Sequence, residues 1–156
     1  MTIVAFKSGT MAADSACWSN GLSQSVPFAK ITRAPDGSLI AMCGKLHDAW
    51  LLREWTLAGM PDDAKPTFRG KDDDAPSILM ARPDGSLWFA RDDLIFAPEP
   101  QPCCIGADYA AMFCEGALEA GASAEVAVAA TIRRHDDAGG SVQVEHLHPA
   151  LQEVAD

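Results

Sequence analysis

The sequence predicts an α+β domain in which two antiparallel sheets are stacked and helices cover their outer faces. Short apolar segments separated by turn residues indicate strands joined as hairpins. Three other segments have apolar residues at helical spacing. The order of strands, helix, strands, two helices and strand suits two sheets, because each sheet needs one face on the core and one face covered by helices. At 156 residues, the chain is expected to form one domain over residues 1–156.

The chain opens with a predicted hairpin. Residues 2–7 are apolar and partly β-branched, Ser8 and Gly9 supply a turn, and residues 10–14 return as a second strand. Residues 19–26 are polar and contain glycine, which predicts a loop. A third strand is expected over residues 27–33.

Two further hairpins are marked by nearly the same turn sequence. Residues 34–38 read Ala-Pro-Asp-Gly-Ser and residues 82–86 read Arg-Pro-Asp-Gly-Ser. Proline presets φ for a tight turn and glycine permits a positive φ. The first turn joins the third strand to a buried strand at residues 39–43, and the second joins residues 78–81 to residues 87–90.

Three helices are predicted between and after these strands. The first ends near Gly59, the second covers residues 107–120, and the third begins after a capping Ser123 and runs to Arg133. The apolar residues that indicate the first are Leu46, Trp50, Leu51, Trp55 and Leu57. Those that indicate the second are Tyr109, Met112, Phe113, Gly116 and Ala117. A last strand is expected over residues 141–145.

The polar connection over residues 61–76 contains the run Asp72-Asp73-Asp74. A metal site there is the less favoured interpretation, and an acidic surface loop is the favoured one. We expect no metal and no cofactor elsewhere, since the five cysteines lack the paired C-x-x-C spacing of a zinc site. Most thiols are expected to be reduced core residues. A redox-active vicinal pair at Cys103 and Cys104 is the less favoured alternative, because vicinal disulfides are strained.

The overall charge excludes some classes of partner. The formal net charge is −10, and the basic residues are scattered, so binding to nucleic acid or to an anionic membrane is not expected. The chain start has no basic region followed by an apolar segment of signal-peptide length, and no apolar segment approaches membrane-spanning length. These features predict a cytoplasmic location.

Four residues at fixed spacing carry the functional signal. Thr2 follows Met1, and a small second residue permits removal of the initiator methionine. Asp14 closes the second strand, Lys30 lies 16 residues beyond it, and Gly44 lies 14 residues beyond Lys30. Taken singly, Asp14 fits a turn cap and Lys30 fits a surface strand residue with a buried stem. Their joint spacing favours a functional set.

This pattern resembles the start of proteasome β-type subunits, which are N-terminal nucleophile (Ntn) hydrolases. The chain is most similar to the bacterial ATP-dependent protease ring subunit and to short proteasome-like proteins of bacteriophages and prophages. The resemblance continues through residues 9–14, 104–106, 120–125 and 138–142, and leaves residues 61–76 and the last few residues without a counterpart. It implies a four-layer αββα sandwich and assembly into a homo-oligomeric ring.

The resemblance also implies a threonine peptidase. After loss of Met1, the Thr2 hydroxyl would attack a peptide carbonyl with the Thr2 α-amine as general base. Lys30 would place a positive charge beside the nucleophile, Asp14 would hold that ammonium, and the Gly44 N–H would face the oxyanion. Met42 occupies the position that lines the substrate side-chain pocket in the family, although an ordinary core methionine is an equally good interpretation.

The sequence departs from the family at three supporting positions. Ala107 stands where a serine hydroxyl normally contacts the terminal amine. In the motif Asp-x-x-Ser/Thr-Gly-Gly, His135 stands in place of the aspartate and Ala138 in place of the hydroxyl residue. Asp136 is a candidate to replace the missing carboxylate by a shift of one residue, and His135 is a candidate partner of the nucleophile. A capped or solvated histidine is the more common arrangement.

Two main functional hypotheses follow. The first is a proteasome-like threonine peptidase, active or degenerate, that acts on peptide or protein substrates in the cytoplasm of a bacterial host. The second is a catalytically inactive Ntn-fold structural or assembly protein that associates with phage structural proteins, for example in a virion. An amidase of small amides is a third, less favoured possibility, because fold does not fix substrate.

Overall fold

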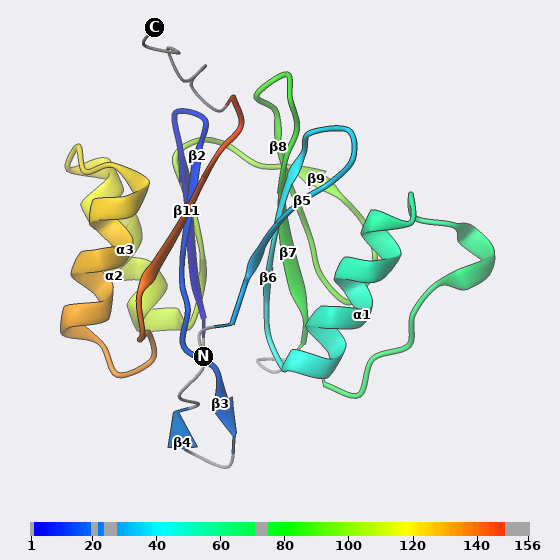
Figure 1. Cartoon of the computed structure of the whole chain (residues 1–156), viewed down its shortest axis with the longest axis horizontal. Coiled ribbons are helices and arrows are strands. Elements are labelled where there is room, and N and C mark those ends of the chain that lie inside the picture. The colour runs from blue at the N-terminus through cyan, green and yellow to red at the C-terminus, as the bar shows by residue number, and fades with distance from the viewer. Residues whose placement is uncertain (1, 20–21, 24–27, 71–74, 149–156) are drawn as a thin grey trace, which may run out of the picture.

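The computed structural model describes residues 2–19, 22–23, 28–70 and 75–148, and these residues form a sandwich of four layers (Figure 1). Helices α2 and α3 cover one sheet, the second sheet packs against the first, and α1 covers the second sheet. The α+β sandwich expected from the sequence is therefore confirmed. The helices are α1 (Leu46–Leu57), α2 (Asp108–Glu119) and α3 (Ala124–Arg134).

The first sheet has the strand order β10-β1-β2-β11, and every neighbouring pair in it is antiparallel. The second has the order β5-β6-β7-β8-β9 and is also antiparallel. The strands of the first sheet are β1 (Ile3–Lys7), β2 (Thr10–Asp14), β10 (Cys103–Gly106) and β11 (Val142–His146). Those of the second are β5 (Ile31–Arg33), β6 (Leu39–Cys43), β7 (Ser77–Ala81), β8 (Leu87–Ala90) and β9 (Ala97–Pro98).

The two strands β1 and β2 read as continuous apolar runs because both faces of their sheet are covered. Alternate side chains point to opposite faces, so Val4 and Phe6 enter the core between the sheets, whereas Ile3 and Ala5 pack against α2 and α3. In β6, Leu39 joins the core between the sheets. Because β1 and β6 are buried on both faces, the ends of these strands are held in fixed positions.

Both Pro-Asp-Gly-Ser turns form as expected. In the first, the Ala34 N–H donates to the Ser38 carbonyl at 2.8 Å, and Gly37 has a φ of +89°. In the second, the Arg82 N–H donates to the Ser86 carbonyl at 2.9 Å, and Gly85 has a φ of +86°. The aspartate of each turn also accepts a hydrogen bond from the N–H two residues on, which closes the turn.

Some elements differ from the sequence-based prediction. The loop expected over residues 19–26 contains parts of a small hairpin, β3 (Trp18–Ser19) and β4 (Leu22–Ser23), and the third strand is shorter than expected at Ile31–Arg33. A 3-10 turn at Asp62–Ala64 interrupts the polar connection. The run Asp72-Asp73-Asp74 lies outside the described residues. No helix in the described ranges is long and apolar enough to cross a membrane.

The large apolar residues that indicated α2 lie mainly on its outer face. Tyr109 is 77% exposed and Met112 is 67% exposed, whereas the buried positions are Ala110, Cys114 and Leu118. Small residues on the inner face let α2 lie close to β1 and β10. The prediction of a helix was correct, but its apolar spacing marked the wrong face.

Candidate active site

Thr2 lies just before β1 and lines a cavity of about 610 Å³. The carbonyl of Thr2 accepts a hydrogen bond from the Ala107 N–H at 3.3 Å. Gly106 has a φ of +147°, and a Cβ there would overlap the Thr2 carbonyl oxygen. Glycine is therefore required where β10 passes the start of β1, and this close approach fixes the backbone of Thr2.

Asp14 and Lys30 form a buried ion pair beside this cavity. The Lys30 Nζ atom lies 2.6 Å from Asp14 Oδ1, Asp14 is 0% exposed and Lys30 is 4% exposed. The same carboxylate oxygen accepts the Ile3 N–H at 2.9 Å, which ties the carboxylate to the residue that follows Thr2. A buried charge needs such partners, and the pair satisfies that requirement for both groups.

The loop between α3 and β11 supplies the other support of Asp14. The Gly139 N–H donates to Asp14 Oδ2 at 3.1 Å, and the Ser141 N–H donates to Ser15 Oγ at 2.8 Å. Gly140 has a φ of +74°, and a Cβ there would overlap Ser15 Oγ. The Gly-Gly-Ser sequence thus has a physical role, because it lets the loop approach β2 closely enough to hold the carboxylate.

Gln143, on β11, holds the segment that carries Lys30. Its side-chain oxygen accepts the Lys30 backbone N–H at 2.8 Å, and its side-chain nitrogen donates to the Phe28 carbonyl. Two residues further along the same face, Glu145 is ion-paired with Arg33 at 3.0 Å. Because β11 is an edge strand, these side chains connect the first sheet to the second beside the buried lysine.

Replacing Gln143 with alanine is expected to lower the free energy of unfolding by about 1–2 kcal/mol, because two backbone groups near Lys30 lose a partner. Urea denaturation measures this change. Glu145→Ala is the control, since it removes the exposed ion pair on the same strand, and we expect it to cost less. Equal effects from the two variants would contradict a specific role for Gln143.

Gly44 lies directly after β6 and borders the same cavity. Its φ is +106°, and a Cβ there would lie 2.9 Å from the Ala75 carbonyl oxygen and 2.9 Å from Pro76 Cα. Helix α1 begins two residues later, so its first N–H groups also lie at the cavity. Helix α2 begins at Asp108, which also lines the cavity. The N-terminal ends of two helices therefore favour negative charge there.

Met42 and Cys43 form part of the cavity wall from β6. Met42 is 3% exposed, and Phe28 and Ala49 continue the apolar wall. Burial raises the pKa of the Cys43 thiol to about 12, while the ammonium of Lys30 lowers it. Cys43 is consequently a neutral thiol at physiological pH.

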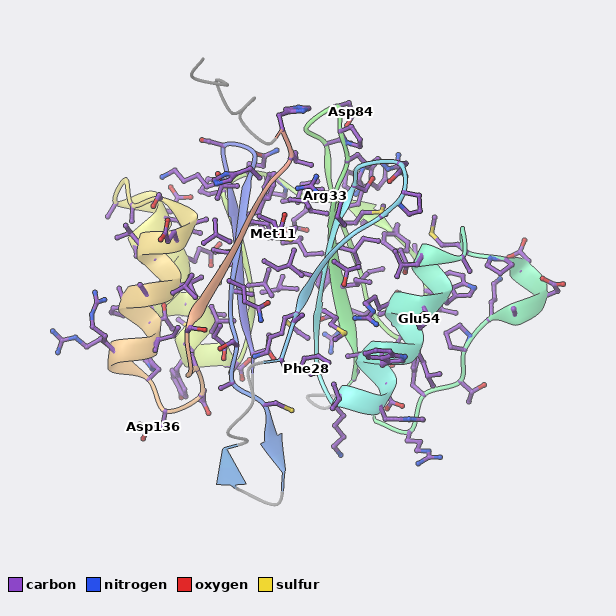
Figure 2. The ribbon with its side chains drawn as sticks, viewed as in Figure 1. Met11, Phe28, Arg33, Glu54, Asp84 and Asp136 are labelled. Carbon is purple, nitrogen blue, oxygen red and sulfur yellow. The ribbon has the colours of Figure 1, made fainter. Side chains whose placement is uncertain are left out.

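The residues at which the sequence departs from the family pattern, and the neighbouring Asp136, have different surroundings in the structure. Ala107 lines the cavity, and its methyl group supplies no hydrogen-bonding atom there. Ala138 is 5% exposed and packs into the core beneath α2 and α3. The ring of His135 packs on Phe113, with 5.1 Å between ring centroids, and Asp136 is exposed and extends away from the space between the sheets (Figure 2).

The residues that the sequence pattern singled out lie together at the cavity, whereas the two candidate replacements lie elsewhere. Thr2, Lys30, Gly44 and Met42 line one cavity, and Asp14 is bonded to the lysine beneath it. Neither His135 nor Asp136 is among the residues that line the cavity. Within the described residues, no group of His, Cys, Asp and Glu side chains could hold a metal ion.

Sequence reasoning missed the supports of the ion pair. Gln143, Ser15 and Ser141 carry no motif by themselves, and their contacts depend on the packing of β11 against β2 and β5. The Gly-Gly-Ser sequence was a usable signal, since glycines in a short loop often mark a close backbone approach.

The fold of this chain has counterparts among solved structures. No protein-family model and no curated protein matches the sequence. Solved structures do match: the structural neighbours are proteasome-like and HslV-like Ntn-hydrolase proteins, and the chain has their sandwich fold.

One neighbour is the BPH protein of Thiobacillus denitrificans, with 19% identity, a TM-score of 0.62, and coverage of 95% of this chain and 98% of that chain. The same protein in complex with epoxomicin gives 21% identity, a TM-score of 0.64, and coverage of 95% and 99%. Eukaryotic HslV from Trypanosoma brucei gives 16% identity, a TM-score of 0.66, and coverage of 93% and 98%. The resemblance found in the sequence is confirmed at the level of fold.

Proposed function

We propose that the chain is a proteasome-like threonine peptidase in which removal of Met1 exposes Thr2 as the nucleophile. One observation carries this proposal: Thr2, Gly44 and Lys30 line a single cavity, and Lys30 is held by the buried carboxylate of Asp14. The fold of the structural neighbours supports it. The cavity is large enough for a peptide side chain, and Met42 lies in its wall.

In the proposed reaction, the Thr2 oxygen bonds to the carbonyl carbon of the substrate, and the hydroxyl proton passes to the Thr2 α-amine. The developing oxyanion is stabilised by the Gly44 N–H and by the N-terminal end of α1, which also lies at the cavity. The amine then gives its proton to the leaving nitrogen of the peptide. Water hydrolyses the resulting ester and restores Thr2.

Lys30 acts on this reaction through its charge. A nearby ammonium disfavours protonation of the α-amine, so the amine is available as a base near neutral pH. Asp14 keeps the ammonium in place and also binds the N–H of Ile3, which sets the position of the residue before it. The pair therefore orients and activates Thr2 together.

Two preparations that differ only in Met1 test the proposal. One is released from a cleavable fusion with Thr2 as its first residue, and the other retains Met1. With fluorogenic peptides, we expect turnover only from the preparation that begins at Thr2, because only it has a free α-amine. One neighbour was solved in complex with epoxomicin, and we expect epoxomicin to inhibit this turnover. Equal turnover by the two preparations, or none from either, would contradict the proposal.

Met42 is expected to set part of the peptide preference. Replacing Met42 with alanine enlarges the cavity where β6 and α1 meet, so larger apolar side chains should be accepted better than before. The measurement compares kcat/KM for two peptides, one with phenylalanine and one with alanine immediately before the cleaved bond. We expect the ratio of the first value to the second to rise about tenfold in the variant. The ratio is internally controlled for the amount of folded protein. An unchanged ratio would place the side-chain pocket elsewhere.

Assembly into a homo-oligomer is part of the proposal. Tyr109, Met112 and Phe113 of α2 expose large apolar surface, and Val126 of α3 is 56% exposed. Exposed apolar surface of this kind is typical of a protein interface. Light scattering is expected to give a molar mass several times that of the 16.5 kDa chain, and a purely monomeric chain would contradict this part.

The second candidate function is that of an inactive structural or assembly protein, for example in a phage particle. It is favoured by Ala107 in the cavity wall and by Ala138 in the core, since neither supplies the hydroxyl found at that position in the family. Each missing hydrogen bond weakens positioning by about 0.5–1.5 kcal/mol. A chain that keeps Met1, lacks turnover and copurifies in a fixed ratio with particle proteins would support this function.

A further inference from the structure

Asp48, in the first turn of α1, is a buried carboxylate that the proposed reaction does not use. It is 1% exposed, and its Oδ2 atom accepts the Arg69 N–H at 3.0 Å and the Gly70 N–H at 2.7 Å. The other oxygen, Oδ1, is buried and has no hydrogen-bond partner among the residues that the structure describes. Burial of a carboxylate is costly unless hydrogen bonds offset it, so Asp48 and residues 69–70 hold each other in place.

The same connection between α1 and β7 returns to the cavity beside Gly44. The ladder between β6 and β7 ends at the pair Cys43 and Ser77, so strand pairing no longer holds Gly44 beyond it. Instead, Gly44 packs on the backbone of the next two residues. A Cβ on Gly44 would lie 2.9 Å from the Ala75 carbonyl oxygen and 2.9 Å from Pro76 Cα. The backbone of these two residues therefore limits where Gly44 can lie.

The connection thus contacts the start of α1 at two points that are close in the sequence. Residues 75–76 pack on Gly44, and residues 69–70 bind Asp48, which lies only four residues after Gly44. Asp48 is itself not among the residues that line the cavity, whereas Gly44 is. A change in the hydrogen bonds of Asp48 can therefore reach the cavity through the connection and through the first turn of α1.

We propose that Asp48 is a positioning residue of the oxyanion site, because its carboxylate holds the connection against the start of α1 and thereby sets the direction of the Gly44 N–H. The inference rests on the proposed function, in which this N–H binds the developing oxyanion. Both hydrogen bonds go to Oδ2, so an amide oxygen at that place should serve as well as a carboxylate oxygen. The role depends on the acceptor and not on the charge.

Kinetics of the chain that begins at Thr2 test this role. Asp48→Leu keeps a side chain of similar size and removes both hydrogen bonds. Loss of one oxyanion donor typically costs about 10²–10³ in rate, so a misdirected donor should lower kcat by about tenfold. KM should stay within about twofold, since the N–H acts on charge that develops only in the transition state. Asp48→Asn keeps an oxygen acceptor, and we expect it to retain kcat within about twofold.

Thr56→Val is the matched control on the same helix. Thr56 is 6% exposed near the other end of α1, where its hydroxyl donates to the Leu52 carbonyl at 2.8 Å. The variant loses a buried hydrogen bond of α1 away from the cavity, so it should leave kcat and KM unchanged. An equal fall in kcat for Asp48→Leu and Asp48→Asn would overturn the proposal, as would a rise in KM alone or the same kcat loss in Thr56→Val.

Hydrogen exchange provides a test that does not need turnover. In folded Asp48→Leu, we expect exchange of the backbone amides of residues 43–46 to become about tenfold faster than in the wild type, whereas Asp48→Asn should match the wild type. The hairpin of β1 and β2 should stay protected in all three chains. Unchanged exchange at residues 43–46 in Asp48→Leu would overturn the proposal. Absence of turnover in the wild type would contradict the proposed function alone, and exchange would still decide whether Asp48 sets the position of Gly44.

Discussion

Thr2→Ala is expected to reduce peptide hydrolysis by the chain that begins at residue 2 to the background rate. The change removes the only group proposed to bond to the substrate and leaves the α-amine, the cavity and the ion pair in place. Loss of a nucleophile usually costs more than about 10³ in rate, since the remaining groups only bind and polarise the substrate. Initial rates with a fluorogenic peptide measure the effect.

Two companion variants sharpen this prediction. Thr2→Ser keeps a hydroxyl on the same carbon, so it should retain part of the activity. Thr10→Ala removes a hydroxyl from β2 that bonds to His146 at the exposed far end of the strand, so it should leave the rate unchanged. Full activity in Thr2→Ala would show that another group performs the reaction.

Lys30→Met is expected to have the largest effect on stability. It leaves the Asp14 carboxylate, which is 0% exposed, without its cationic partner, although two backbone N–H groups still bind it. Breaking a buried ion pair by removing one partner costs about 3–5 kcal/mol, because an uncompensated charge remains in the core. Denaturation in urea measures the loss. Turnover should also fall to background, since Thr2 loses the neighbouring charge.

The double variant Asp14→Asn with Lys30→Met distinguishes a buried charge from a packing defect. It removes both charges and should recover part of the lost stability. Lys65→Met provides a control of the same chemistry, because Lys65 pairs with the exposed Asp62 on the surface, and we expect its stability to be close to that of the wild type. An effect of Lys30→Met no larger than that of Lys65→Met would contradict the buried pair.

Much of the fold could be predicted because local signals and burial agree. The two Pro-Asp-Gly-Ser turns fix their hairpins through backbone and aspartate hydrogen bonds within the turn. Ser123 caps α3 through a hydrogen bond from the Val126 N–H to its hydroxyl at 3.2 Å. The β9 strand and the β3–β4 hairpin were missed, since segments of two residues show no periodicity.

The faces of the helices were harder to predict. In α1, Trp50 is 44% exposed and Leu46 is 45% exposed, whereas Asp48 is buried and binds the N–H groups of Arg69 and Gly70. The guanidinium of Arg53 covers the Trp50 ring at 3.8 Å from its centroid. Apolar spacing marks a helix, but when apolar residues occur on several sides it does not decide which side faces the sheet.

The candidate site was predicted in its main residues and not in its supports. The spacing of Asp14, Lys30 and Gly44 suggested one site, and these positions do meet because β2 and β6 end, and β5 begins, at the same side of the sandwich. The sequence left open whether His135 and Asp136 replace the missing polar groups, and in the structure His135 packs on Phe113 and neither residue lines the cavity.

The most direct test of the account is the intact mass of the chain beginning at Thr2, quenched with acid during turnover of a slowly hydrolysed peptide ester. We predict an added mass equal to the acyl part of the substrate, carried by the tryptic peptide of residues 2–7 and absent from Thr2→Ala. Turnover that proceeds with the acyl group attached elsewhere, or with an unmodified Thr2 under conditions that trap the ester, would contradict Thr2 as the nucleophile.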